Sequence, residues 1–120
     1  MKTPAEQIII GYIEALLWTE SDENEKYLDA DLSSDDMATE SMEQLTQDCQ
    51  QFLAAFPLNA IPEIETWRHV GHDFLLTRNG HGAGFWDGDY PINGDKITAL
   101  CEEFDPVNAY VGDDDLIYLG

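Results

Sequence analysis

The N-terminal half of the chain carries apolar residues at helical spacing. A first run, PAEQIIIGYIEALLWTE (residues 4–20), places Ile9, Ile13 and Leu16 on one face, and Pro4 falls in its first turn. Further isoleucine and leucine residues widen this face, as is typical of a helix that is buried on most sides. The pattern therefore predicts a helix over residues 4–20 at the centre of the core.

A second helix is predicted from a cap at Ser33 or Ser34 to about Pro57. Asp35 and Asp36 would favour the positive end of its dipole. Its apolar positions follow the spacing i, i+4, i+7, i+8, i+11 of a core stripe: Leu45, Cys49, Phe52, Leu53 and Phe56. Both cysteines of the chain lie in such apolar helical patterns, so we expect buried free thiols rather than a disulfide.

The stretch HDFLLTRNGHGAGFWD (residues 72–87) reads as a β-hairpin. Asn79-Gly80 is the strongest short-range hairpin signal, because a type I′ turn needs positive φ at both positions. Residues 72–77 and 83–87 would then be its two strands. The alternative is a catalytic loop, but this register puts His72 and His81 at different ends of the hairpin and supplies no Ser or Cys nucleophile.

The remaining elements complete a single compact domain over residues 1–120. IPEIETWRHVG (residues 61–71) predicts a short helix that ends at Gly71, and NGDKITALCEEF (residues 93–104) predicts a third amphipathic helix. VNAYV and LIYL predict a second strand pair across an acidic turn at Gly112–Asp115. We therefore expect an α+β fold, in which N-terminal helices pack on a small antiparallel sheet built from two hairpins with an intervening helix.

Charge is the unusual property of this composition. The 120 residues include 25 Asp and Glu but only 5 Lys and Arg, which gives a formal net charge of −20. Such a surface repels nucleic acids and anionic membranes and attracts basic surfaces. The apolar run Ile8–Trp18 contains Glu14 and lacks a basic segment before it, so we expect neither a signal peptide nor a membrane span.

Metal and cofactor motifs are incomplete. Asp29, Asp31, Ser33 and Glu40 match positions 1, 3, 5 and 12 of a calcium loop, but Ser34 stands where such a loop needs glycine. The two histidines at positions 69 and 72 lack the second ligand pair of a zinc site. A phosphate-binding glycine loop and a G-x-S-x-G motif are also missing, so we expect no metal, no cofactor and no enzymatic activity.

Three segments carry a resemblance to known proteins: YIEALLWTE (residues 12–20), HDFLLTRNGHGAGFWD and YVGDDDLIYLG (residues 110–120). The chain resembles a group of small acidic proteins encoded by bacteriophages and plasmids. The function of that group is largely unassigned, so the resemblance implies no catalytic or binding residues. It implies a mobile element in the cytoplasm of a bacterial host, where short acidic proteins often disarm host defences.

The charge density leads to a hypothesis of DNA mimicry. A compact chain of this length spans roughly 35 Å, and duplex DNA of that length carries about 20 phosphate charges. We expect a non-enzymatic inhibitor that fills the basic nucleic-acid groove of a host defence complex, of the anti-CRISPR or anti-restriction type. The predicted partner-binding residues are the carboxylates of the acidic loop and the second helix: Glu20, Asp22, Glu23, Glu25, Asp29, Asp31, Asp35, Asp36, Glu40 and Glu43.

Two alternatives remain open at this point. The first is a protein-binding adaptor that uses an apolar patch near the glycine-rich hairpin, on the face that carries Leu75 and Trp86. It requires that face to be exposed rather than covered by a helix. The second is a small hydrolase that uses His81 and Asp87, which requires a concave pocket around them.

Overall fold

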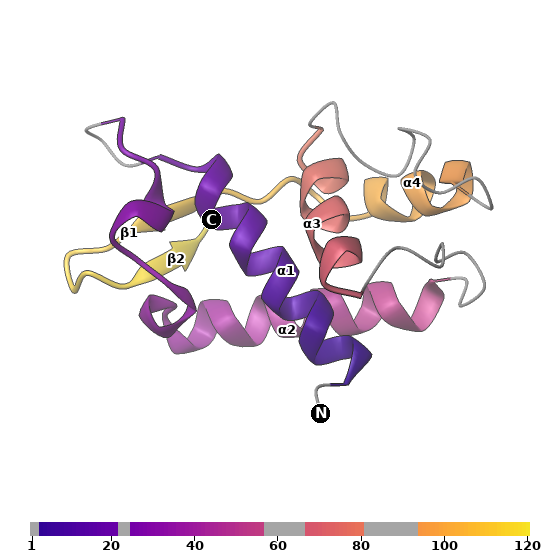
Figure 1. Cartoon of the computed structure of the whole chain (residues 1–120), viewed down its shortest axis with the longest axis horizontal. Helices are drawn as coiled ribbons and strands as arrows, with labels where there is room; N and C mark the ends of the chain where they lie inside the picture. The colour runs from indigo at the N-terminus through magenta and orange to yellow at the C-terminus, as the bar shows by residue number, and fades with distance from the viewer. Residues whose placement is uncertain (1–2, 22–24, 57–66, 81–93) are drawn as a thin grey trace.

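The structure is a computed structural model that describes residues 3–21, 25–56, 67–80 and 94–120. Figure 1 shows helices over most of these residues and a small sheet at one end. In order, the elements are α1 (Pro4–Thr19), the 3-10 helices η1 (Leu28–Ala30) and η2 (Ser34–Asp36), α2 (Thr39–Ala55), α3 (Trp67–Arg78), α4 (Gly94–Glu102), β1 (Ala109–Val111) and β2 (Ile117–Leu119).

Helix α1 forms as the sequence predicts, and its position in the core is confirmed. The Thr3 side chain accepts a hydrogen bond from the Glu6 N–H, and Pro4 occupies the first turn, so two local signals start the helix. Ile8, Tyr12 and Leu16 are completely buried. Of the predicted face, Ile13 and Leu16 are buried and Ile9 is partly buried, so the buried surface is centred one position away, on Ile8 and Tyr12.

The closest approach in the fold is between α1 and α3, which share the most extensive contact among the described elements. Gly11 of α1 lies against the carbonyl group of Arg68, and Gly71 of α3 lies against that of Ile8. A Cβ at either glycine would overlap backbone atoms that cannot move independently of their helix. The two glycines thus set the distance between the helices.

Aromatic rings fill the space between α3 and its neighbours. Phe74 stacks on Phe52 of α2 with ring centroids 4.1 Å apart and an interplanar angle of 7°. On other sides it meets Tyr12 of α1 at 5.4 Å and Phe104, after α4, at 5.0 Å. One side chain therefore joins α3 to three other segments, with the offset and tilted geometries that aromatic pairs prefer.

A buried ion pair lies at the C-terminal end of α3. The Arg78 guanidinium donates to Asp48 Oδ2 at 2.8 Å and to the Tyr12 hydroxyl at 3.0 Å, and its Nε donates to the Asp105 carbonyl at 2.6 Å. The side chains of Arg78 and Asp48 are 9% and 12% exposed. Because each charge has several partners, this burial is compatible with a stable fold.

The sheet is a single two-stranded antiparallel ladder that pairs Ala109 with Leu119 and Val111 with Ile117. It is attached to the start of α2, where Ala38 N–H donates to the Ile117 carbonyl at 2.9 Å. The predicted strand pair near the C-terminus is therefore confirmed, as are the helix within residues 93–104 and the buried free thiols of Cys49 and Cys101. Burial raises the pKa of both thiols.

The predicted hairpin over residues 72–87 is wrong in its first strand. Residues 72–77 belong to α3, so the short helix predicted to end at Gly71 continues to Arg78. The Asn-Gly pair ends this helix: Asn79 N–H donates to the Leu75 carbonyl, and Gly80 has a φ of 77°. A glycine with positive φ at a helix C-terminus uses the same conformational freedom as a hairpin turn. Residues 83–87 lie outside the described part of the chain.

The start of the second helix also differs from the prediction. Ser33 caps only the short η2, in which Asp36 Oδ2 accepts a hydrogen bond from the Ser33 N–H at 2.8 Å. Met37 and Ala38 are then extended, since they contact strand β2, and α2 begins at Thr39. The fold is α+β, mostly helical in the described residues, with one hairpin rather than two.

Substitution of Gly71 by Ala tests the α1–α3 contact. In a helix interior without close neighbours, Gly→Ala stabilises by about 1 kcal/mol. Here the added methyl group meets the Ile8 carbonyl, and we expect a loss of about 2–3 kcal/mol in the free energy of unfolding. Urea denaturation measures the change, with Gly80→Asn, at an exposed left-handed position, as the control within about 1 kcal/mol of wild type. Stabilisation by Gly71→Ala would contradict the close contact.

Candidate functional site

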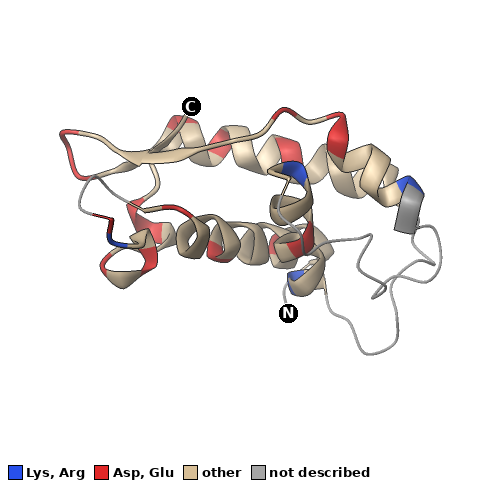
Figure 2. Ribbon diagram, turned by 90° about the horizontal axis from the view of Figure 1, so that it is seen from above, with Lys and Arg blue, Asp and Glu red and all other residues tan. Residues whose placement is uncertain are grey.

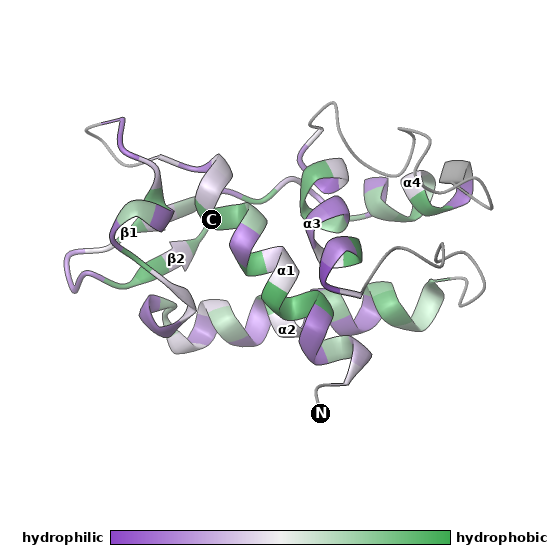
Figure 3. Cartoon of the chain, in the orientation of Figure 1, coloured by the Kyte–Doolittle hydropathy of each residue, from purple (hydrophilic) through white to green (hydrophobic). Residues whose placement is uncertain are grey.

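The carboxylates predicted to bind a partner lie mainly at one end of the described structure, beside the sheet. Exposed side chains among them belong to Glu25, Asp29, Asp31, Asp35, Glu40 and Glu43. Glu20 and Asp36 are partly buried, and Asp22 and Glu23 lie outside the described residues. Figure 2 shows acidic residues along the segment before α2 and along the turn of the hairpin, and Figure 3 shows that the turn is hydrophilic whereas the segment before α2 is mixed.

The carboxylates Asp36, Glu40 and Glu43, which were predicted to lie on the second helix, do not all belong to one helix. Asp36 belongs to η2 and caps it, so it does not share a helical face with Glu40 and Glu43. Beyond these two carboxylates, the exposed positions of α2 carry mainly neutral amides: Gln44, Gln47, Gln50 and Gln51. The acidic surface therefore covers the N-terminal end of α2 and not its whole length.

The turn between β1 and β2 joins this surface, which the sequence does not reveal. Asp113 and Asp115 line a groove of about 650 Å³ together with Asp31 from the segment before α2. From the sequence, the acidic run reads as a solvated turn. Its approach to Asp31 depends on the contact of Met37 with Ile117, which is a tertiary feature.

Tyr118 of β2 is bonded to this turn. Its hydroxyl donates to Asp114 Oδ2 at 2.6 Å, and this bond lowers the pKa of Asp114 and raises that of Tyr118 to about 12. The start of α2 is the third segment, since the Leu119 N–H donates to Ser41 Oγ at 3.1 Å, and the negative charge of Glu40 raises the Tyr118 pKa further. We call these three segments the acidic end: Glu25, Asp29, Asp31, Asp35, Asp36, Glu40, Glu43, Asp113, Asp114 and Asp115.

Few positive charges oppose this surface. Among the described residues, Arg78 is buried against Asp48, and Arg68 pairs with Glu14 on the α1–α3 side of the molecule. Lys26 pairs with Asp31 at 2.6 Å, and it is the one basic residue that the described part of the acidic end contains. Ion pairing therefore neutralises the core, while the acidic end keeps a strong net negative charge.

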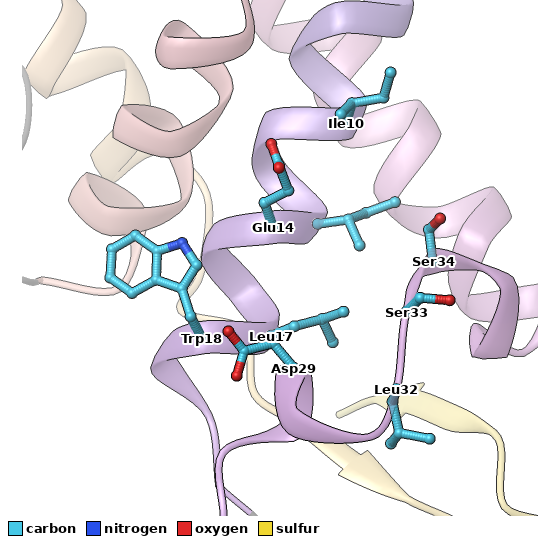
Figure 4. Close-up of a pocket in the computed structure, with 9 residues that line it drawn as sticks. Ile10, Glu14, Leu17, Trp18, Asp29, Leu32, Ser33 and Ser34 are labelled. Atoms are coloured by element: carbon cyan, nitrogen blue, oxygen red, sulfur yellow. The ribbon is translucent and has the colours of Figure 1, made fainter.

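A second hollow of about 410 Å³ lies between α1 and the segment before α2 (Figure 4). Ile10, Ile13 and Leu17 supply its apolar wall, and Trp18 at its margin is 43% exposed. Leu75, by contrast, is completely buried, so the apolar face expected near the hairpin is core at that residue. Trp86 lies outside the described residues.

The two histidines in the described residues, His69 and His72, form pairs with carboxylates. His72 Nε2 lies 3.2 Å from Glu14 Oε1, and His69 Nε2 lies 3.2 Å from Asp73 Oδ2. In the described part of the chain, His, Cys, Asp and Glu side chains form no group of three able to hold a metal ion. His81 and Asp87, the residues of the hydrolase alternative, lie outside that part.

Searches against protein-family models, curated proteins and solved structures return no match. Within the described residues, the helices are too short or too polar to cross a bilayer. The charge and the shape of the chain are therefore the features that bear on its function.

The Glu14 carboxylate provides a test of the α1–α3 electrostatics. Its hydrogen bond from Arg68, with a smaller contribution from His72, lowers its pKa below the ordinary value of 4.5. The pair therefore stabilises the fold above about pH 4.5, and this contribution is lost as the pH falls through the lowered pKa. We expect the stability difference between wild type and Glu14→Gln, measured by urea denaturation, to shrink between pH 6 and pH 3. A constant difference would contradict the assignment.

Proposed function

We propose that the protein is a non-enzymatic DNA mimic that occupies the basic nucleic-acid groove of a bacterial host defence complex, such as a restriction enzyme or a CRISPR surveillance complex. It would act in the host cytoplasm, on behalf of a mobile element. The observation that supports this function is the acidic end, where carboxylates from three segments converge beside a single lysine in the described structure. Neither the core nor the sheet requires this charge.

The length and the total charge of the molecule are close to those of a short DNA duplex. The longest extent of the molecule is 43 Å, and the shorter extents are 30 and 25 Å. Duplex DNA of the same length carries about 25 phosphate charges, compared with the formal net charge of −20 on this chain. A partner that binds DNA through lysine and arginine would therefore meet a comparable total charge, of which the acidic end supplies ten of the 25 carboxylates.

The position of the charges favours recognition over solubility alone. Tertiary contacts hold the acidic segments together: Met37 bridges to Ile117, and the Leu119 N–H donates to Ser41 Oγ of α2 at 3.1 Å. Carboxylates on a fixed scaffold lose less conformational entropy on binding than carboxylates on a disordered tail. A preorganised acidic surface is therefore suited to compete with DNA.

A protein-binding adaptor is the alternative, but it would use a different surface from the face of Leu75 that was expected. The observation that favours it is the hollow beside Trp18. An apolar wall with an exposed tryptophan at its margin is typical of a site that receives an apolar side chain of a partner. Such binding would depend little on salt, whereas binding through the acidic end would weaken steeply as salt is added. Salt dependence therefore separates the two functions.

Two variants of equal net charge test the mimic. Asp35→Asn/Glu40→Gln/Glu43→Gln removes carboxylates from the acidic end and leaves the Asp36 cap intact. Glu102→Gln/Glu103→Gln/Asp105→Asn removes the same number from exposed positions at the end of α4 and in the connection that follows it. The assay is displacement of a labelled 25-base-pair duplex from the partner that wild type captures from bacterial lysate at low salt.

We expect the first variant to compete less well than wild type, with a cost on the order of 1 kcal/mol per carboxylate removed. The second variant should compete nearly as well as wild type, and thermal melting should show both to be folded. Equal competition by the two variants would mean that the acidic end is not the binding site. Failure of wild type to displace the duplex would refute DNA mimicry.

A further inference from the structure

Two tyrosine rings stand exposed in the groove of the acidic end. Tyr27 and Tyr110 are 59% and 54% exposed, although a tyrosine buries a large apolar area when it packs in a core. Both line the groove of about 650 Å³, and they do so together with Asp31, Asp113 and Asp115. We call this site the tyrosine groove.

The ring of Tyr110 is held in place from behind. It stacks on Tyr118 with centroids 5.8 Å apart and an interplanar angle of 20°. The Tyr118 ring is in turn fixed by its hydroxyl bond to Asp114. Tyr110 borders both the hollow shared with Tyr118 and the tyrosine groove, so its ring presents surface to the groove without losing the stack.

We propose that the tyrosine groove binds arginine side chains of the protein partner in preference to lysine side chains. This inference rests on the proposed function, and it adds a chemical selectivity to it. A guanidinium is planar and weakly hydrated, so it can lie over a tyrosine ring and donate two hydrogen bonds to a carboxylate at once. A lysine ammonium is a hydrated point charge and gains mainly the Coulomb attraction.

Charge complementarity selects this occupant over others. The groove carries three carboxylates, so it repels nucleic acid and anionic lipid. Its exposed rings distinguish it from the outer surface of α2, where the exposed positions after Glu40 and Glu43 carry mainly neutral amides. The groove therefore matches a basic protein segment that contains arginine, of the kind that lines DNA-binding channels.

The probes are nonapeptides of arginine and of lysine, which carry the same charge. Binding to the full chain is measured by fluorescence anisotropy at 50 mM salt, for wild type, for Tyr27→Leu/Tyr110→Leu and for Trp18→Leu. The double variant leaves every carboxylate in place, and Trp18 is a matched control because it is an exposed aromatic residue that lines the other hollow. Tyr27→Leu alone serves if the double variant does not fold.

We expect wild type to bind the arginine peptide more tightly than the lysine peptide. Loss of the rings should weaken arginine binding by about two- to five-fold for each ring and leave lysine binding unchanged, while Trp18→Leu keeps the wild-type ratio. A preference that survives loss of the rings, or equal affinities in wild type, would overturn the inference and leave DNA mimicry standing. Absence of binding by either peptide would overturn both.

Discussion

The contact between α1 and α3 is the constraint on which the other parts of the fold depend. Gly11 and Gly71 let the two backbones meet directly, and this places Phe74 against Tyr12 and Phe52. One turn further along α3, Arg78 reaches Tyr12 and Asp48 at hydrogen-bonding distance. A wider separation of α1 and α3 would leave the charges of Arg78 and Asp48 buried with fewer partners, which is costly.

The end of α3 also fixes the chain that leads to the sheet. The Asn79 side chain accepts from the Val107 N–H at 2.8 Å and donates to the Val107 carbonyl at 2.9 Å. Val107 lies two residues before the start of β1, and β2 contacts the segment that leads into α2. The acidic end is therefore built on connections that run back to α3, which explains how a surface rich in like charges keeps a defined shape.

The distribution of basic residues has a physical consequence. In the described structure, Arg68 and Arg78 are engaged by carboxylates of the helical core. Arg78 satisfies the buried Asp48 carboxylate, which would otherwise be costly to desolvate, whereas the Arg68–Glu14 pair is partly exposed. What remains at the surface beside the sheet is acidic, with exposed tyrosines among the carboxylates. The few cations stabilise the fold, and the many anions remain available to a partner.

Much of this architecture could be predicted from local patterns. The apolar spacing identifies α1 and α4, the strand pair follows from VNAYV and LIYL, and the acidic loop is visible in the sequence. Residues 72–77 are ambiguous because the short apolar run Phe74–Leu76 suits a buried strand as well as a helix, and Asn79-Gly80 suits a hairpin turn as well as a helix end. The choice between them depends on the contact of Gly71 with α1, which local patterns do not contain.

The acidic end shows the same division between local and tertiary information. Its carboxylates can be read from composition, but the meeting of Asp31 with Asp113 and Asp115 depends on how the hairpin docks on α2. The cap formed by Asp36 was also hidden, because the spacing of Asp36 and Glu40 suits one continuous helix. Sequence identifies the charge, and only the fold identifies the surface.

The most direct test of the mimic is the salt dependence of its affinity for the captured partner, measured from 50 to 300 mM salt. Binding through carboxylates predicts a steep linear fall of log K with log salt concentration. The slope should become shallower in Asp35→Asn/Glu40→Gln/Glu43→Gln, which removes three charges from the acidic end. It should stay unchanged in Glu102→Gln/Glu103→Gln/Asp105→Asn. A slope near zero for wild type, or the same slope for all three proteins, would contradict the account.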